Sequence, residues 1–179
     1  MKEKSFEPGR DNIVLIGMPG AGKSTLGIVL AKILCMDFVD ADLLIQQSCD
    51  KSLQRLIDTL GPDAFLEIEN QVLSEMSFEH SVIATGGSMV LYPEAMAHLK
   101  EGSTVIWLQT PFSQLEKRMP ADLYDRGIAV PAGTPLREIY EERCVLYARY
   151  ADLIVASQDG ESDTARLVED VMRTVGLET

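Results

Sequence analysis

The sequence predicts a three-layer α/β fold, a five-stranded parallel sheet with helices on both of its faces. Three observations support this prediction. Short, mostly apolar runs of strand length alternate with longer segments whose apolar residues recur at helical spacing. Of the 179 residues, 46% are apolar, which is enough to bury one sizeable core. A glycine-rich segment at 17–25 separates the first strand from the first helix, where parallel sheets bind ligands. We expect a single domain over residues 1–179.

Five short runs are predicted to be strands because they are rich in apolar residues and are bounded by charged residues or by glycine. Strands of a parallel sheet are covered on both faces, so they form apolar runs and do not alternate with polar residues. The predicted strands lie at 12–16, 36–39, 81–84, 104–108 and 153–156.

Proline and glycine mark several ends of the predicted helices. Gly61 and Pro62 separate the third predicted helix from the fourth, and Pro93 stands in the first turn of the fifth. Residues 120–131 contain prolines, glycine and mixed charges without periodicity, and they are predicted to be irregular. The predicted helices lie at 25–34, 42–48, 53–60, 63–78, 93–100, 111–119, 134–150 and 162–175.

The segment 17–25 fits the phosphate-binding pattern G-x-x-x-x-G-K-[ST], with Gly17, Gly22, Lys23 and Ser24 at the fixed positions. Its glycines allow a tight turn that directs backbone N–H groups at phosphate oxygens, and the following helix adds a partial positive charge. Lys23 is predicted to reach the β- and γ-phosphates, and the Ser24 hydroxyl to ligate Mg²⁺. The residues predicted to bind the phosphates of ATP are Gly20, Ala21, Gly22, Lys23, Ser24 and Thr25.

Asp40 and Asp42 follow the second predicted strand. Phosphoryl transfer needs one acid near Mg²⁺ and a second acid that orients or deprotonates the acceptor hydroxyl. Two aspartates at i and i+2 after a strand can supply both acids. The alternative is that one of them only caps the following helix.

The overall charge limits the partners. A formal net charge of −12 argues against nucleic acid or an anionic membrane surface, so binding of ATP must rest on a local site. The residues before Asn12 are charged and polar, unlike a signal peptide, and no apolar run approaches the length of a membrane span. We expect a cytoplasmic monomer.

The cysteines are Cys35, Cys49 and Cys144, an odd number, widely spaced and without a C-x-x-C pair. They are predicted to be buried thiols in a reducing compartment, without a disulfide framework or a zinc site.

Further motifs follow the phosphate loop and Asp40-x-Asp42. They are Gly86-Gly87 after the third strand, Arg126, Glu142-Arg143-x-x-Leu146-Tyr147 and Ala151-Asp152. Taken in order, these residues resemble the shikimate kinase family. The resemblance extends over residues 12–173, and the ordered set is far more specific than the phosphate loop alone.

The resemblance implies a P-loop NTPase fold of the nucleoside-monophosphate-kinase type, with an acceptor-binding helical region at about 41–78 and a mobile lid at about 120–131. It also implies transfer of the γ-phosphate of ATP to a hydroxyl of a small carboxylate, shikimate by family default. By this resemblance Asp40 would hold Mg²⁺ through water, and Asp42 would bind the acceptor hydroxyl and act as its base. The catalytic residues would be Lys23, Asp42 and the lid arginine Arg126.

Other roles are carried across in the same way. Gly86 and Gly87 would let backbone N–H groups approach the acceptor, and Arg143 would bind its carboxylate. Arg118 is a candidate for packing on adenine. The alternative for Arg143 is a surface ion pair with Glu138 or Glu142, and the alternative for Arg126 is a solvated loop charge.

The chain departs from the family pattern around the acceptor and the lid. The family has Phe-Arg-x-x-Glu where this chain has Phe65-Leu66-Glu67-Ile68-Glu69, so Leu66 occupies the position of an acceptor-binding arginine. Ser88 replaces the third glycine of a triple-glycine run, and the lid has Arg126-Gly127-Ile128 where the family has Arg-Pro-Leu. With one arginine fewer, the charges of Arg143 and Asp42 balance. A zwitterion such as homoserine, with its ammonium near Asp42 or Glu69, is therefore an alternative acceptor.

Basic residues exclude one class of acceptor. From Ala41 to Lys100 the only Lys and Arg residues are Lys51, Arg55 and Lys100, too few to hold the acceptor phosphate of a nucleotide kinase. The alternative to an enzyme is a protein that senses nucleotides and does not catalyse a reaction. The joint presence of Lys23, Ser24, Asp40, Asp42 and Arg126 argues against it.

Overall fold

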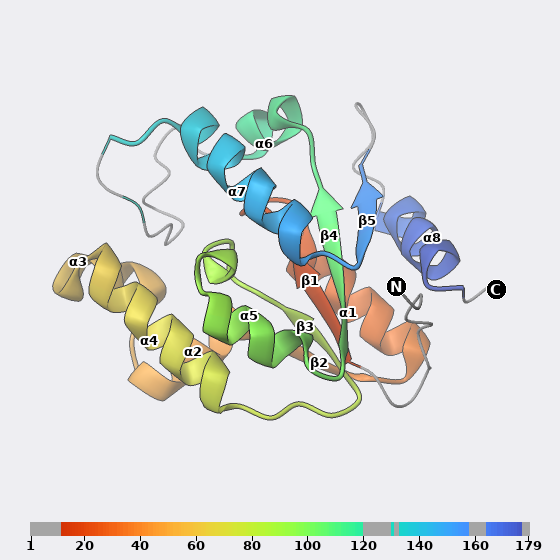
Figure 1. Ribbon diagram of the computed structural model, residues 1–179, viewed down its shortest axis with the longest axis horizontal. Coiled ribbons are helices and arrows are strands. Elements are labelled where there is room, and N and C mark those ends of the chain that lie inside the picture. Colours follow the sequence, from red (N-terminus) through yellow and green to blue (C-terminus); the bar gives the residue numbers. More distant parts are fainter. Residues whose placement is uncertain (1–11, 120–129, 131–132, 158–163, 177–179) are drawn as a thin grey trace.

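The computed structural model describes residues 12–119, 130, 133–157 and 164–176 (Figure 1). A five-stranded parallel sheet forms its centre, in the order β2-β3-β1-β4-β5. The predicted α/β class with five parallel strands is confirmed. The strands are β1 (Asn12–Ile16), β2 (Asp37–Asp40), β3 (Ser81–Ala84), β4 (Ser103–Gln109) and β5 (Leu153–Ala156).

Helices cover both faces of the sheet and extend beyond one edge (Figure 1). They are α1 (Lys23–Leu34), α2 (Ala41–Cys49), α3 (Leu53–Leu60), α4 (Pro62–Glu75), α5 (Pro93–Lys100), α6 (Phe112–Arg118), α7 (Leu136–Tyr150) and α8 (Thr164–Thr174), with a 3-10 turn η1 (Met89–Leu91).

The buried residues form three apolar clusters. Alternate residues of β1 point to opposite faces, so Ile16 packs toward α5 and α7 whereas Ile13 packs toward α1 and α8. The third cluster is separate from the sheet and belongs to α2, α3 and α4, with Ile45, Leu56 and Phe65 at its centre. The third cluster holds these three helices together, whereas Ala41 of α2 and Leu73 of α4 join them to the cluster of the sheet.

The boundaries of several elements agree with the prediction. The helices α3 and α5 begin and end as predicted, as do β1, β3 and β5. Helix α1 begins two residues earlier, at Lys23, because Gly22 adopts a left-handed conformation (φ +92°) as its N-cap. Helix α4 ends at Glu75 and not at residue 78. Of the predicted irregular segment and lid at 120–131, only Val130 lies within the described residues.

The prediction of buried cysteines is wrong for Cys35, which is exposed, and Cys49 and Cys144 are only partly buried. Cys35 is the left-handed C-cap of α1, so its side chain projects beyond the helix end into solvent. All three are free thiols. In the part of the chain that the structure describes, no helix is both long enough and apolar enough to span a bilayer.

Candidate active site

A cavity of about 270 Å³ lies between the loop after β1, the loop after β3 and the helices α2, α4 and α7. Two groups of residues line it. The phosphate-loop side consists of Pro19, Gly20, Gly22, Lys23, Ser24 and Thr25. We call the other group the acceptor side, because the sequence predicts that the acceptor binds there. It includes Asp42, Phe65, Glu69, Gly86, Gly87, Ser88 and Arg143, beside Thr85, which follows β3.

The phosphate loop presents backbone donors and one ammonium group. Gly22 caps α1 without a side-chain hydrogen bond, so the first N–H groups of α1 have no intrahelical acceptor. The Lys23 ammonium donates to the carbonyl oxygens of Gly17, at 2.9 Å, and Met18, at 3.0 Å. Burial lowers the pKa of Lys23 to about 8, with the nearby Asp42 carboxylate opposing this shift. The loop thus gathers positive charge at one end of the cavity.

The two aspartates after β2 have different positions. Asp40 Oδ1 accepts from the backbone N–H groups of Asp42, at 3.0 Å, and Leu43, at 3.3 Å, so Asp40 is the N-cap of α2. Asp40 therefore caps the helix, and its other oxygen accepts no hydrogen bond from the described residues. Asp42 lines the cavity, and burial raises the pKa of its carboxyl.

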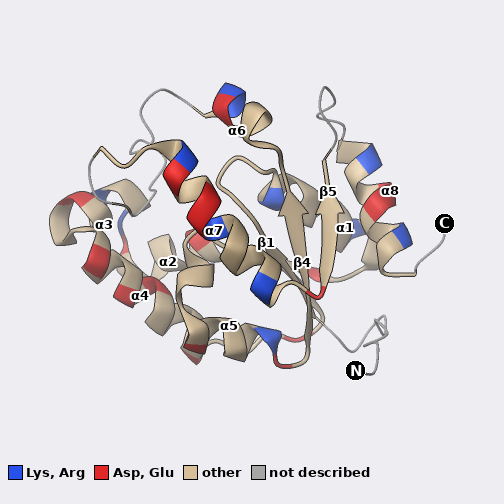
Figure 2. Cartoon of the chain, turned by 45° about the horizontal axis from the view of Figure 1, so that its top comes forward, with Lys and Arg blue, Asp and Glu red and all other residues tan. Residues whose placement is uncertain are grey.

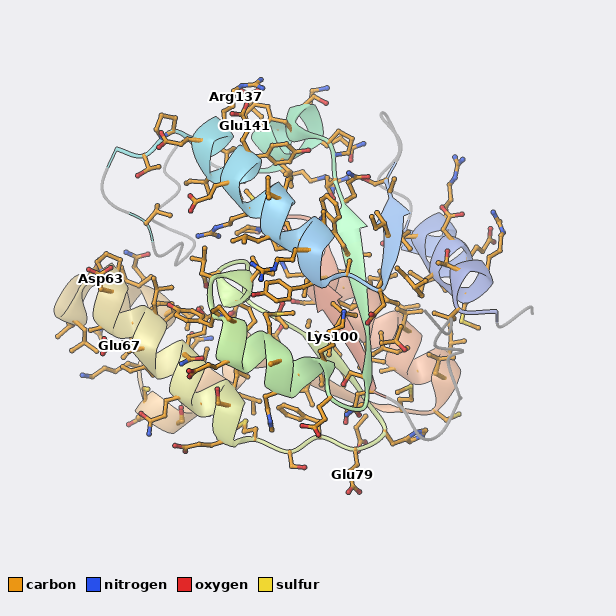
Figure 3. The ribbon with its side chains drawn as sticks, in the orientation of Figure 1. Asp63, Glu67, Glu79, Lys100, Arg137 and Glu141 are labelled. Atoms are coloured by element: carbon orange, nitrogen blue, oxygen red, sulfur yellow. The ribbon has the colours of Figure 1, made fainter. Side chains whose placement is uncertain are left out.

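Helix α4 directs one face into the cavity. Phe65 and Glu69, one helical turn apart, both line it. Leu66 is not among the lining residues and packs in the cluster of α2, α3 and α4. Glu67 is exposed on the outer side of the helix (Figure 3). All charged residues of α4 are acidic, as Figure 2 shows. The helix therefore brings no cation to the acceptor side.

Glu69 is a buried carboxyl group with one hydrogen bond. Its side chain is 1% exposed, and its Oε2 accepts a short hydrogen bond from the Ser88 hydroxyl. Its Oε1 has no partner within the described residues. Burial raises the pKa of Glu69 to about 7, while the Ser88 hydrogen bond and the charge on Arg143 act in the opposite direction.

Arg143 is buried on the inner face of α7, between Ile139 and Tyr147 at spacings of four residues. It is 2% exposed, whereas Glu138 and Glu142 are exposed, so the alternative of a surface ion pair is wrong. Its Nη2 has no hydrogen-bond partner in the described part of the chain. A buried guanidinium nitrogen without a partner at the wall of a cavity is suited to bind an anion.

The loop after β3 leaves no room for side chains at two positions. A Cβ added to Gly86 would overlap Glu69 Oε1 and would lie 2.9 Å from Asp42 Oδ1. A Cβ added to Gly87 would lie 2.6 Å from Pro19 Cδ, in the phosphate loop. The Tyr147 hydroxyl donates to the Gly87 carbonyl at 2.7 Å. The two glycines therefore permit close contact between both sides of the cavity.

Several predicted residues lie elsewhere. Arg118, near the end of α6, donates to the carbonyl of Gly20 at 3.3 Å, beside the phosphate loop. Ala21 is buried within that loop, and Arg126 lies outside the described residues. Lys51 and Arg55 line a separate surface depression between α2 and α3.

Lys100, which is labelled in Figure 3, lies 2.8 Å from the carboxylate of Asp152. The cations that line the cavity, among the described residues, are therefore Lys23 and Arg143.

Four of the residues that line the cavity were not predicted from the sequence: Pro19, Phe65, Thr85 and Ser88. A signal was available for Phe65, because Phe65 and Glu69 share one helical face at a spacing of four. Pro19 lies in the loop after β1 and Thr85 follows β3, and these two strands pair with each other. How closely the two loops approach depends on the contact between Gly87 and Pro19.

A phosphate loop that faces buried carboxyl groups and a buried guanidinium, across a small cavity at the carboxyl ends of parallel strands, defines a P-loop small-molecule kinase. Comparison with known proteins gives the family. The family model for shikimate kinase matches residues 19–175. The chain belongs to the shikimate kinase family.

Individual relatives agree with this assignment. The chain is 40% identical to a shikimate kinase of Synechococcus sp. (strain RCC307) over 162 residues, which cover 88% of this chain and 82% of that protein. It is 35% identical to a shikimate kinase of Clostridium botulinum (strain Okra / Type B1), covering 93% of this chain and 99% of that protein. Among solved structures, shikimate kinase from Acinetobacter baumannii in complex with shikimate has a TM-score of 0.82 and 27% identity, with 93% of each chain covered. The protein is thus an ATP-dependent kinase that phosphorylates a hydroxyl group.

Proposed function

We propose that the protein transfers the γ-phosphate of ATP to a hydroxyl of a small carboxylate bound on the acceptor side of the cavity. The observation that carries this proposal is the unpartnered Nη2 of Arg143, a buried anion-binding group in the same cavity as Lys23 and Asp42. Shikimate is the first acceptor to test, because the relatives in the family are shikimate kinases.

The phosphate loop would bind the phosphates of ATP through the N–H groups of residues 20–25. Ser24 and Asp40 would hold Mg²⁺, Asp40 through water, since hydroxyl and carboxylate oxygens suit this ion and one Asp40 oxygen remains available. When bound, Mg²⁺ supplies neutralising charge at the β- and γ-phosphates. Lys23 would leave its carbonyl partners and contact the γ-phosphate, where it stabilises the charge that develops in the transition state.

Asp42 would orient the acceptor hydroxyl and accept its proton. As the acceptor oxygen bonds to the γ-phosphorus, the bond to the bridging oxygen of ADP breaks. Arg143 would bind the acceptor carboxylate. Arg126 is proposed to contact the phosphates from the lid, and Arg118 to pack on adenine.

The test is an ADP-release assay with Mg·ATP and a panel of hydroxy acids that includes shikimate. Arg143→Ala should lower kcat/KM for the preferred acceptor by about 10- to 100-fold, the value of a charge-assisted hydrogen bond. Arg149→Ala, on the exposed side of the same helix, is the matched control. Absence of acceptor-dependent ADP release with every compound would contradict the proposal and favour the nucleotide-sensing alternative.

A further inference from the structure

Glu69 has no role in the proposed phosphoryl transfer, although it lines the same cavity. It is almost completely buried, and no Lys or Arg of the described residues forms an ion pair with it. Its single hydrogen bond, from Ser88, engages Oε2 and leaves Oε1 without a donor. A buried carboxyl oxygen without a donor is costly in free energy. Its position in the cavity wall suggests that a ligand supplies the missing donor.

The position of Oε1 indicates which part of a ligand it would meet. An added Cβ on Gly86 would overlap this oxygen and approach Asp42 Oδ1, so both oxygens face the same small space. In the same cavity, Arg143 Nη2 also lacks a partner. One wall therefore needs a donor and another needs an acceptor. A ligand that satisfies both carries a hydrogen-bond donor and an anionic group, and an ammonium group is the donor that also neutralises an ionised Glu69 carboxylate.

Charged and titratable groups surround Glu69 on every element packed against it: Lys23 of α1, Asp42 of α2, Ser88 and Tyr92 on either side of η1, and Arg143 and Tyr147 of α7. Lys23 is already bonded to two carbonyls. Leu66 packs away from the cavity, so α4 supplies no cation to neutralise Glu69.

We propose that Glu69 Oε1 binds the ammonium group of a small amino-acid alcohol whose carboxylate is bound by Arg143. This inference rests on the proposed function, because it names the acceptor class of the same site. The terminal hydroxyl lies at Asp42, which takes its proton as the oxygen bonds to the γ-phosphorus and ADP leaves. Shikimate has no ammonium group and would leave Oε1 without a charged donor.

Matched acceptors test this assignment directly. L-Homoserine and 2,4-dihydroxybutyrate have the same chain and differ in the ammonium group, so kcat/KM is measured for both and for shikimate. The unmodified protein should prefer homoserine to dihydroxybutyrate by at least about 10-fold. Glu69→Gln keeps the size of the side chain and should lower this preference by about 10- to 100-fold. Glu67→Gln, exposed on the same helix, should leave the preference unchanged.

The pH profile gives a readout that a purely structural role would not move. The preference for homoserine should rise with pH through about 7, as Glu69 ionises. Ser88→Ala removes a hydrogen bond that lowers the pKa of Glu69, so the rise should shift to higher pH.

Four outcomes would overturn the assignment. The first is efficient phosphorylation of shikimate without phosphorylation of homoserine, and the second is an equal effect of Glu69→Gln on kcat/KM for both matched acceptors. The third is a preference for homoserine that does not change with pH. The fourth is activity toward the hydroxy acids that falls as pH rises through 7. The last would identify Glu69 as a neutral donor. If no compound releases ADP, the proposed function fails. Calorimetric binding of homoserine to the unmodified protein, weakened in Glu69→Gln, then still decides whether the ammonium site exists.

Discussion

The two sides of the cavity are built in different ways. The phosphate-loop side comes from one contiguous segment, 17–25, and its donors are mainly backbone N–H groups. The acceptor side is assembled from side chains of α2, α4 and α7 and from the loop after β3. A backbone site tolerates changes in its side chains, whereas each substitution on the acceptor side alters what can bind. Nucleotide binding and acceptor choice are therefore encoded in separate parts of the sequence.

The two sides also differ in how their polar groups are satisfied before a ligand binds. Lys23, on the phosphate-loop side, already donates to two carbonyl oxygens. On the acceptor side, Glu69 Oε1 and Arg143 Nη2 lack partners within the described residues. We therefore expect the acceptor side to gain new hydrogen bonds when a ligand binds, whereas Lys23 would exchange one set of partners for another.

The largest expected effect comes from the phosphate-loop side. Lys23→Ala should lower kcat by about 1,000-fold with any acceptor, because it removes charge stabilisation at the γ-phosphate. Steady-state ADP release with saturating acceptor measures the effect. Lys32→Ala, exposed at the end of the same helix, is the control. Near-normal turnover of Lys23→Ala would mean that this loop is not the catalytic one.

A smaller effect is expected from the acceptor side, in the stability of the protein without ligand. The pKa of Glu69 is raised from 4.5 to about 7, so its contribution to stability is complete below pH 4.5 and is lost as pH rises through 7. Glu69→Gln removes this titration. Between pH 4.5 and 8 its unfolding free energy should rise relative to the unmodified protein, by on the order of 2–3 kcal/mol.

Urea unfolding at both pH values measures this difference. Asp42, whose pKa is also raised, titrates in both proteins and is coupled to Glu69, so the comparison reports the titration of this pair. A difference that stays constant with pH would show that Glu69 is not held in the protonated form by burial.

The smallest effect tests whether the two sides are independent. Tyr147→Phe removes the hydrogen bond to the Gly87 carbonyl and should cost about 1 kcal/mol of unfolding free energy. We expect the KM of the acceptor to rise several-fold while the KM of ATP is unchanged, with Tyr150→Phe as control. An equal rise in both values would show that the contact of Gly87 with Pro19 couples the sides.

Most of the fold could be predicted from the sequence because its signals are local. Gly61 ends α3 and Pro93 begins α5, and the apolar runs predict every strand end to within one residue. Two features, the start of α1 and the turn η1, were misjudged for physical reasons. Lys23 and Ser24 belong to a helix because Gly22 is left-handed, and η1 was not predicted because a single 3-10 turn has no periodicity.

The candidate site could be predicted only in part. The phosphate loop and the two aspartates are recognisable as contiguous patterns, and Arg143 was expected from the family resemblance. The contact between Glu69 and Ser88 joins α4 to the loop after β3. It depends on how α4 packs against the loop after β3, which no local pattern specifies. For the same reason, the sequence identified the loss of an arginine at Leu66 but not that Leu66 faces the cluster of α2, α3 and α4.

The separate apolar cluster of α2, α3 and α4 has a consequence for divergence within such a family. Its core is distinct from those that hold the sheet and the phosphate loop. Changes such as Leu66 can therefore accumulate in it while nucleotide binding is retained. Selection on the acceptor can act on a few side chains outside the phosphate loop, so an existing kinase scaffold can be recruited to a new metabolite.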